Sequence, residues 1–176
     1  MKINLLTLAV SLVVVAATIL SCGKDDENAV TPKCNINSGY FSFKDSSFVF
    51  ALPTAFTPNG DGINDLYIPS ATSGNVSDYS LVIYNDEDNS KVFETNSMNL
   101  GWNGIGGTGY KYSVMIHFKD EFGSVVDTCS YLYLLSSGPD GCAKFIQADA
   151  GNYYFPDQFD ATVGVPVYVT AEKLCF

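Results

Sequence analysis

The sequence contains a single histidine, His117, and few basic residues. Nine Lys and Arg residues stand against 19 Asp and Glu residues, so the formal net charge is −10 at pH 7. Such a surface repels phosphate backbones, so we expect no nucleic acid partner, whereas divalent cations are favoured. A Ser-His-acid or Cys-His catalytic site would have to use His117, which the strand pattern described below assigns to a solvent-facing position.

Other common signatures are also missing. No segment keeps a helical period for long, which argues against a helical fold. The glycine-rich run at 104–109 leads into a predicted strand instead of a helix, so it reads as a flexible turn and not as a phosphate-binding loop. The cysteines lack the paired spacing of zinc ligands, and we therefore expect no zinc.

The first residues form an uncharged apolar run, Ile3 to Leu20, after Lys2. The run leads into "ILSC", which ends at Cys22 and resembles the lipobox of bacterial lipoproteins. This motif predicts a lipoprotein signal peptide over residues 1–21. A plain transmembrane anchor is the alternative, because the run is nearly long enough to span a bilayer. Acylation of Cys22 would anchor the protein to a membrane through its acyl chains.

Residues 22–33 are polar and without periodicity, which predicts a disordered tether after the acylated Cys22. The stretch "KDDE" at 24–27 resembles the acidic export signal of surface lipoproteins of Bacteroidota. We therefore expect an outer-membrane protein on the cell-surface side, with the periplasmic face as the alternative.

Beyond the tether, short apolar bursts alternate with Gly, Pro, Asn, Asp and Ser, as strands and turns do. Residues 79–84 and 91–95 predict a hairpin, and the alternation over 110–119 predicts a half-buried antiparallel strand, with Tyr110, Tyr112, Val114, Ile116 and Phe118 on one face. A returning strand follows at 125–135, with weaker candidates at 144–148, 153–155 and 166–170. The predicted fold is all-β, an antiparallel immunoglobulin-like β-sandwich forming one domain over 34–176.

Four cysteines follow the anchor: Cys34, Cys129, Cys142 and Cys175. An even number in an exported chain predicts two disulfides, and their spacing leaves all three pairings open.

The run "FTPNGDGINDLY" at 56–67 is dense in turn-forming residues. Its Asn-Gly and Asp-Gly pairs suit positive φ and predict a compound turn before a strand at 65–69. Alternatively, Asn59, Asp61, Asn64 and Asp65 supply oxygens in a calcium-loop pattern, which makes calcium the one cofactor that the sequence suggests. With Gly62 at the sixth loop position, the first and twelfth positions are Thr57 and Ile68, so the usual acidic end ligands are absent. The acidic group Asp86, Glu87 and Asp88 is interpreted as a solvated loop tip.

Taken in order, "LPTAFTPNGDGIND", "LVIYN", "KVFET", "GWNGIGG" and "YKYSVMIHF" resemble the gliding-motility-associated C-terminal domain of Bacteroidota. The resemblance covers 52–135 and leaves 136–176 as an additional C-terminal segment. It implies a small β-sandwich that, in many exported proteins, sorts the chain through the type IX secretion system.

These features predict a lipid-anchored envelope lipoprotein whose β-sandwich is a non-catalytic structural or recognition module and not an enzyme. A type IX sorting-type domain is the first alternative, and a small carbohydrate-acting envelope hydrolase is the second. The expected partners are the membrane, through Cys22, and an extracellular protein or glycan. Tyr153 and Tyr154 are the best candidates for a binding surface, because neighbouring strand residues face opposite ways.

Overall fold

Short strands separated by polar turns make up nearly all regular structure in the computed structural model, which describes residues 34, 41–44, 48–72, 76–144 and 153–175. All of them lie in one compact unit, Pro32–Phe176. The strands are β1 (Phe41–Lys44), β2 (Val49–Leu52), β3 (Ala55–Phe56), β4 (Ser70–Ala71), β5 (Ser77–Asn85), β6 (Lys91–Thr95), β7 (Lys111–Lys119), β8 (Val125–Leu134), β9 (Ala143–Lys144), β10 (Phe159–Asp160), β11 (Val165–Pro166) and β12 (Leu174–Cys175). Two short 3-10 turns, Pro139–Gly141 and Pro156–Gln158, complete the structure.

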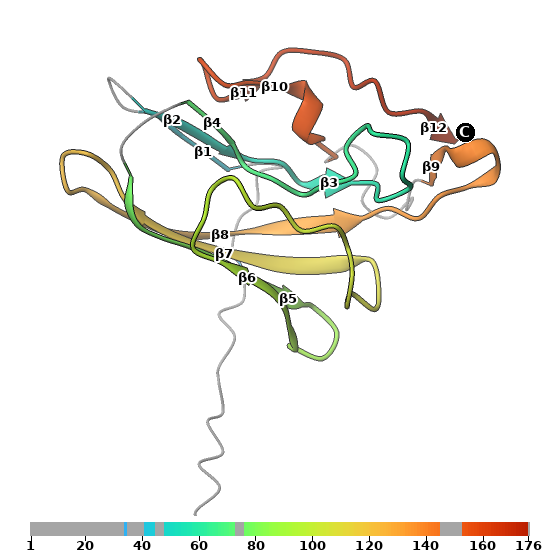
Figure 1. Cartoon of the computed structure of the whole chain (residues 1–176), viewed down its shortest axis with the longest axis horizontal. Helices are drawn as coiled ribbons and strands as arrows, with labels where there is room; N and C mark the ends of the chain where they lie inside the picture. Colours follow the sequence, from blue (N-terminus) through green and yellow to red (C-terminus); the bar gives the residue numbers. More distant parts are fainter. Residues whose placement is uncertain (1–33, 35–40, 45–47, 73–75, 145–152, 176) are drawn as a thin grey trace, which may run out of the picture. The chain divides into compact units, whose positions relative to one another are not determined.

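Two sheets form the body of the fold (Figure 1). The larger has the strand order β3-β8-β7-β5-β6, in which only the β3–β8 pair is parallel. The smaller has the order β1-β2-β4 and is antiparallel. The expected all-β, predominantly antiparallel sandwich is confirmed.

The core lies between these two sheets. Phe118 of β7 contacts Phe43 of β1, Phe50 of β2 and the adjacent Phe48, with ring centroids 5.0–5.7 Å apart. Along β7, Tyr112, Val114, Ile116 and Phe118 are buried, as the alternation predicts. Tyr110, expected on the same face, lies before the strand and is 43% exposed. Burial of these aromatic rings supplies much of the apolar surface that stabilises the fold.

The two predicted disulfides are confirmed, and the structure gives their pairing. Cys34 bonds to Cys129, and Cys142 bonds to Cys175, with Cα atoms 5.5 and 5.3 Å apart. The second bridge joins Cys175 of β12 to Cys142, which directly precedes β9, and β9 and β12 pair in parallel.

Three strand predictions, at 65–69, 153–155 and 166–170, differ from the structure. Residues 153–155 form no strand, and of 166–170 only Pro166 lies in one, because the nearby backbone groups bond elsewhere. The N–H groups of Tyr154 and Phe155, for example, donate to side-chain oxygens of Thr54 and Gln158. The expected strand at 65–69 reduces to one bridge between Tyr67 and Trp102. Of the predicted strand 144–148, only Lys144 is described, at the end of β9.

The predicted signal peptide, tether and Cys22 lie outside the described residues. Within the described part of the chain, no helix is long and apolar enough to cross a membrane.

Candidate functional site

The most distinctive local structure is the signature loop, residues 56–67, between β3 and the Tyr67–Trp102 bridge. Aromatic packing fixes its ends. Phe56 contacts both Tyr67 and Trp102, with ring centroids 6.1 and 5.4 Å apart, and Trp102 packs edge-on against Tyr112 of β7. Tyr67 and Trp102 exchange two backbone hydrogen bonds of 2.8 and 3.0 Å. Ring packing and paired backbone groups therefore hold the two ends of the loop together.

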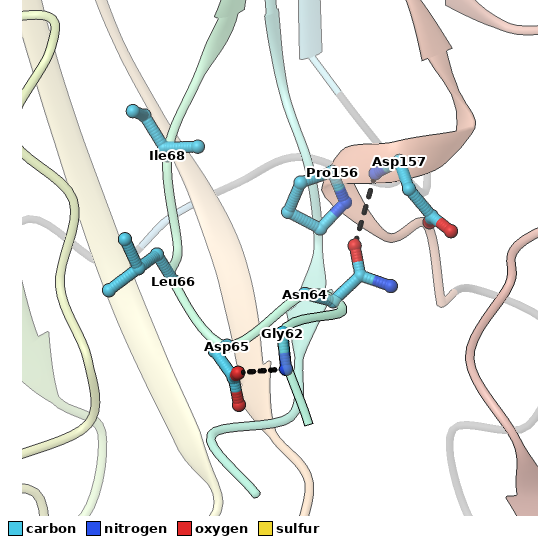
Figure 2. A pocket seen from close by; sticks show the side chains of 7 residues that line it. All are labelled: Gly62, Asn64, Asp65, Leu66, Ile68, Pro156 and Asp157. Carbon is cyan, nitrogen blue, oxygen red and sulfur yellow. Dashed lines mark hydrogen bonds between the residues drawn. The ribbon is translucent and has the colours of Figure 1, made fainter. Parts of the chain in front are cut away.

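Side-chain oxygens organise the loop from within. Asp65 makes two of these bonds. One carboxylate oxygen accepts the N–H of Gly60 at 2.6 Å, and the other accepts the N–H of Gly62 at 2.7 Å; Figure 2 shows the bond to Gly62. Asn59 Oδ1 accepts the N–H of Asp61, and Asp61 Oδ1 accepts the N–H of Ile63. These are two successive Asx turns, so the predicted compound turn is what the structure contains.

The two glycines are needed for their backbone angles. Gly60 and Gly62 have φ of 80° and 87°, and a Cβ atom on either would meet no atom within 4 Å. Space is therefore available, and positive φ alone favours glycine there.

The C-terminal segment, residues 153–175, lies against the signature loop through Asn64. Asn64 Oδ1 accepts the N–H of Asp157 at 3.1 Å (Figure 2), while its amide nitrogen lies 3.3 Å from Thr170 Oγ1 and 3.4 Å from Glu172 Oε2. Asp157 in turn accepts hydrogen bonds from Thr170 and from the Ala171 N–H. One asparagine of the predicted ion-binding set thus connects the loop to a segment about a hundred residues later.

Glu172 is a buried carboxylate in an acidic setting. It is only 5% exposed, and its Oε1 has no hydrogen-bond partner. Burial, followed by the negative charges of Asp61, Asp157 and Asp65, raises the pKa of Glu172 to about 7, although the hydrogen bond from Asn64 acts in the opposite direction. Thr57, fully buried at the start of the loop, has a hydroxyl that likewise lacks a partner.

A hollow of about 540 Å³ opens beside this contact. Its lining is shared between the loop and the C-terminal segment (Figure 2): Gly62, Asn64, Asp65, Leu66, Ile68, Pro156 and Asp157. Leu66 is 46% exposed at its rim. Because the accessible lining is mostly apolar with carboxylates at one side, the hollow suits an apolar group such as a peptide side chain.

The four predicted calcium ligands lie in the signature loop, and each of their side-chain oxygens already accepts a hydrogen bond from an N–H group. As these side chains lie, no three His, Cys, Asp or Glu residues of the described chain are grouped to hold a metal ion. The calcium site stays a prediction. Sequence reasoning missed Asp157 and Glu172, because nothing in the local pattern places residues of the chain end beside this loop.

The other predicted positions serve local roles. Asp86 accepts a hydrogen bond from Ser113, and Asp88 accepts two from Ser90, as expected of a loop tip. His117 Nδ1 lies 3.9 Å from Asp127 Oδ2 on the outer face of β7, and both side chains are substantially exposed.

Tyr153 and Tyr154 are both half-buried. Tyr153 packs edge-on against Tyr133, and the carbonyl of Tyr154 accepts hydrogen bonds from Thr54 and Ala55. Their role as a binding surface stays a prediction.

Comparison with protein families gives one match: the model of the CHU_C type IX secretion signal domain matches residues 50–148. This range includes the signature loop and the whole larger sheet. Searches of curated proteins and of solved structures each found no match.

Proposed function

The chain belongs to the CHU_C type IX secretion signal domain family, and from this premise we propose that its β-sandwich is a sorting-type module that takes an envelope protein to the cell surface. The observation that carries the proposal is the family match over residues 50–148. The signature loop, whose ends are held together by packed aromatic rings, is the part of the domain best suited to recognition by a secretion machine.

The second candidate function is a non-catalytic recognition module that stays in the envelope, held by acyl chains on Cys22. Two observations favour retention of the whole domain. The C-terminal segment inserts Phe155, 2% exposed, into a buried cluster with Ala55, Leu135 and Ala143, and the Cys142–Cys175 bridge ties its end down. A label to be cut off would gain little from such packing. The hollow beside Asn64 would then receive an extracellular protein or glycan.

The test compares the protein in wild-type cells with that in cells lacking the type IX secretion machine. Surface exposure is measured by adding protease to intact cells, and the intact mass is measured on protein extracted from membranes. Sorting predicts that surface exposure is lost without the machine. Anchored retention predicts a mass equal to residues 22–176 plus acyl chains, and release from the membrane in a Cys22→Ala variant.

The outcomes separate the two functions. Surface exposure that persists without the machine contradicts the sorting role. A chain truncated within the sandwich, or one without lipid on Cys22, contradicts the retained lipoprotein.

A further inference from the structure

Two buried oxygens beside the signature loop have no partner. Thr57 Oγ1 lies near the start of the signature loop, and Glu172 Oε1 comes from the C-terminal segment. An unpaired buried oxygen costs free energy, and a buried carboxylate without a counter-charge costs more. Glu172 is more than nine-tenths buried and hydrogen-bonds to Asn64 of the loop, so its carboxylate is held against it.

The surroundings of Glu172 are acidic. Asp61, Asp65 and Asp157 all act on it electrostatically. None of these four carboxylates takes part in an ion pair within the described residues. The adjacent Lys173 directs its ammonium to the carbonyl of Asp140 instead. Two segments of the described chain therefore place carboxylates here that accept hydrogen bonds but have no basic side chain as an ion-pair partner.

The spacing in the loop indicates what would compensate it. With Gly62 at position six of a calcium-type loop, Thr57, Asn59, Asp61 and Asp65 occupy positions one, three, five and nine, which are ligand positions. Position twelve, where a glutamate normally binds through both oxygens, is Ile68. Glu172, from the C-terminal segment, supplies the carboxylate that position twelve lacks.

We propose that the signature loop and the C-terminal segment together form a calcium site, in which Glu172 replaces the missing terminal glutamate beside Asp61 and Asp65. Asn59 and Thr57 add neutral oxygens. Three carboxylate oxygens of Asp61 and Asp65 accept backbone N–H groups, and Asp61 Oδ2 accepts the side-chain amide of Asn59; each oxygen keeps a further lone pair for a cation. Binding would draw Glu172 and Asp61 inward and fasten the C-terminal segment to the loop.

The test measures binding of Ca²⁺ alone by calorimetry to the full-length protein in detergent, after treatment with chelator. We expect one ion per chain, and an affinity at least about tenfold weaker in Glu172→Gln, because one charged ligand is lost. Asp127→Asn, on the outer face of β8, is the matched control and should bind as the wild type does. Without calcium, Glu172→Gln should be as thermally stable as the wild type or more so, which separates loss of a ligand from misfolding.

The proposal is overturned if the wild-type chain binds no calcium at millimolar concentration. It is also overturned if Asp61→Asn weakens binding but Glu172→Gln does not, since the site would then lie in the loop alone.

Discussion

At the scale of single residues, Asp65 shows how one side chain can fix a loop. Its two oxygens accept the N–H groups of Gly60 and Gly62, which would otherwise have only water as a partner. Hydrogen bonds to a charged group contribute about 1.5–3 kcal/mol each, and exposure reduces this. We expect Asp65→Ala to lower the free energy of unfolding by about 2 kcal/mol in urea titrations, whereas Asp127→Ala should change it little. Equal stability of the two variants would mean that the loop is held by the packed aromatic rings at its ends alone.

Glu172 gives the molecule a pH dependence with a defined sign. Its pKa is raised from the model-compound value of 4.5 to about 7 by burial and then by Asp61, Asp157 and Asp65. The native state therefore binds the proton more tightly than the unfolded state, and this contribution to stability is full below about pH 4.5 and lost as pH rises through 7. In chelator, the free energy of unfolding of Glu172→Gln relative to the wild type should increase between pH 4.5 and 7. A difference that stays constant across this range would contradict the assignment.

At the scale of elements, the Cys142–Cys175 bridge determines how firmly the C-terminal segment is held. It links cysteines 33 positions apart, and closing a loop of that length contributes about 3–4 kcal/mol. We expect the double variant Cys142→Ser/Cys175→Ser to lose about this much stability and to be cut by protease within residues 153–175 much faster. The control, Cys34→Ser/Cys129→Ser, should lose stability without selective cutting of that segment. Similar cutting patterns in both variants would show that packing of Phe155, and not the bridge, holds the segment.

Strands with a clear period, or with apolar runs bounded by turn residues, could be predicted: the hairpin 79–84 and 91–95 and the returning strand 125–135 correspond to β5, β6 and β8. The alternation from Tyr112 to Phe118 gave β7 and its buried face, since one side meets the core and the other meets solvent. β2, Val49–Leu52, is buried at every residue, so it has no period to detect and was not predicted as a strand. Residues 166–170 include strand-forming side chains, yet the N–H groups of Val167 and Tyr168 donate to the carbonyl of Gln158, and that of Ala171 donates to the carboxylate of Asp157. These bonds depend on the tertiary structure and could not be predicted from local sequence.

The same limit applies to the site. The compound turn within 56–67 depends on neighbouring residues only, so its Asn-Gly and Asp-Gly pairs were enough to predict it. The contacts of Asn64 with Asp157 and Glu172 span about a hundred residues, and no spacing rule relates positions so far apart. The two disulfides were predicted by count, and their pairing required the fold.

At the scale of the whole molecule, the cysteines report on both folding and anchoring. With Cys34–Cys129 and Cys142–Cys175 formed, the only other cysteine in the chain is Cys22. If acylation occupies the sulfur of Cys22, protein isolated from the envelope should show no free thiol under denaturing conditions, and its mass should be lower by four hydrogens than that of the reduced chain. One free thiol per chain would mean that the bridges form but Cys22 carries no lipid on sulfur. Two or more would mean that a bridge seen in the fold is not formed in the envelope, and the C-terminal segment would then be held to the signature loop by Asn64 and packing alone.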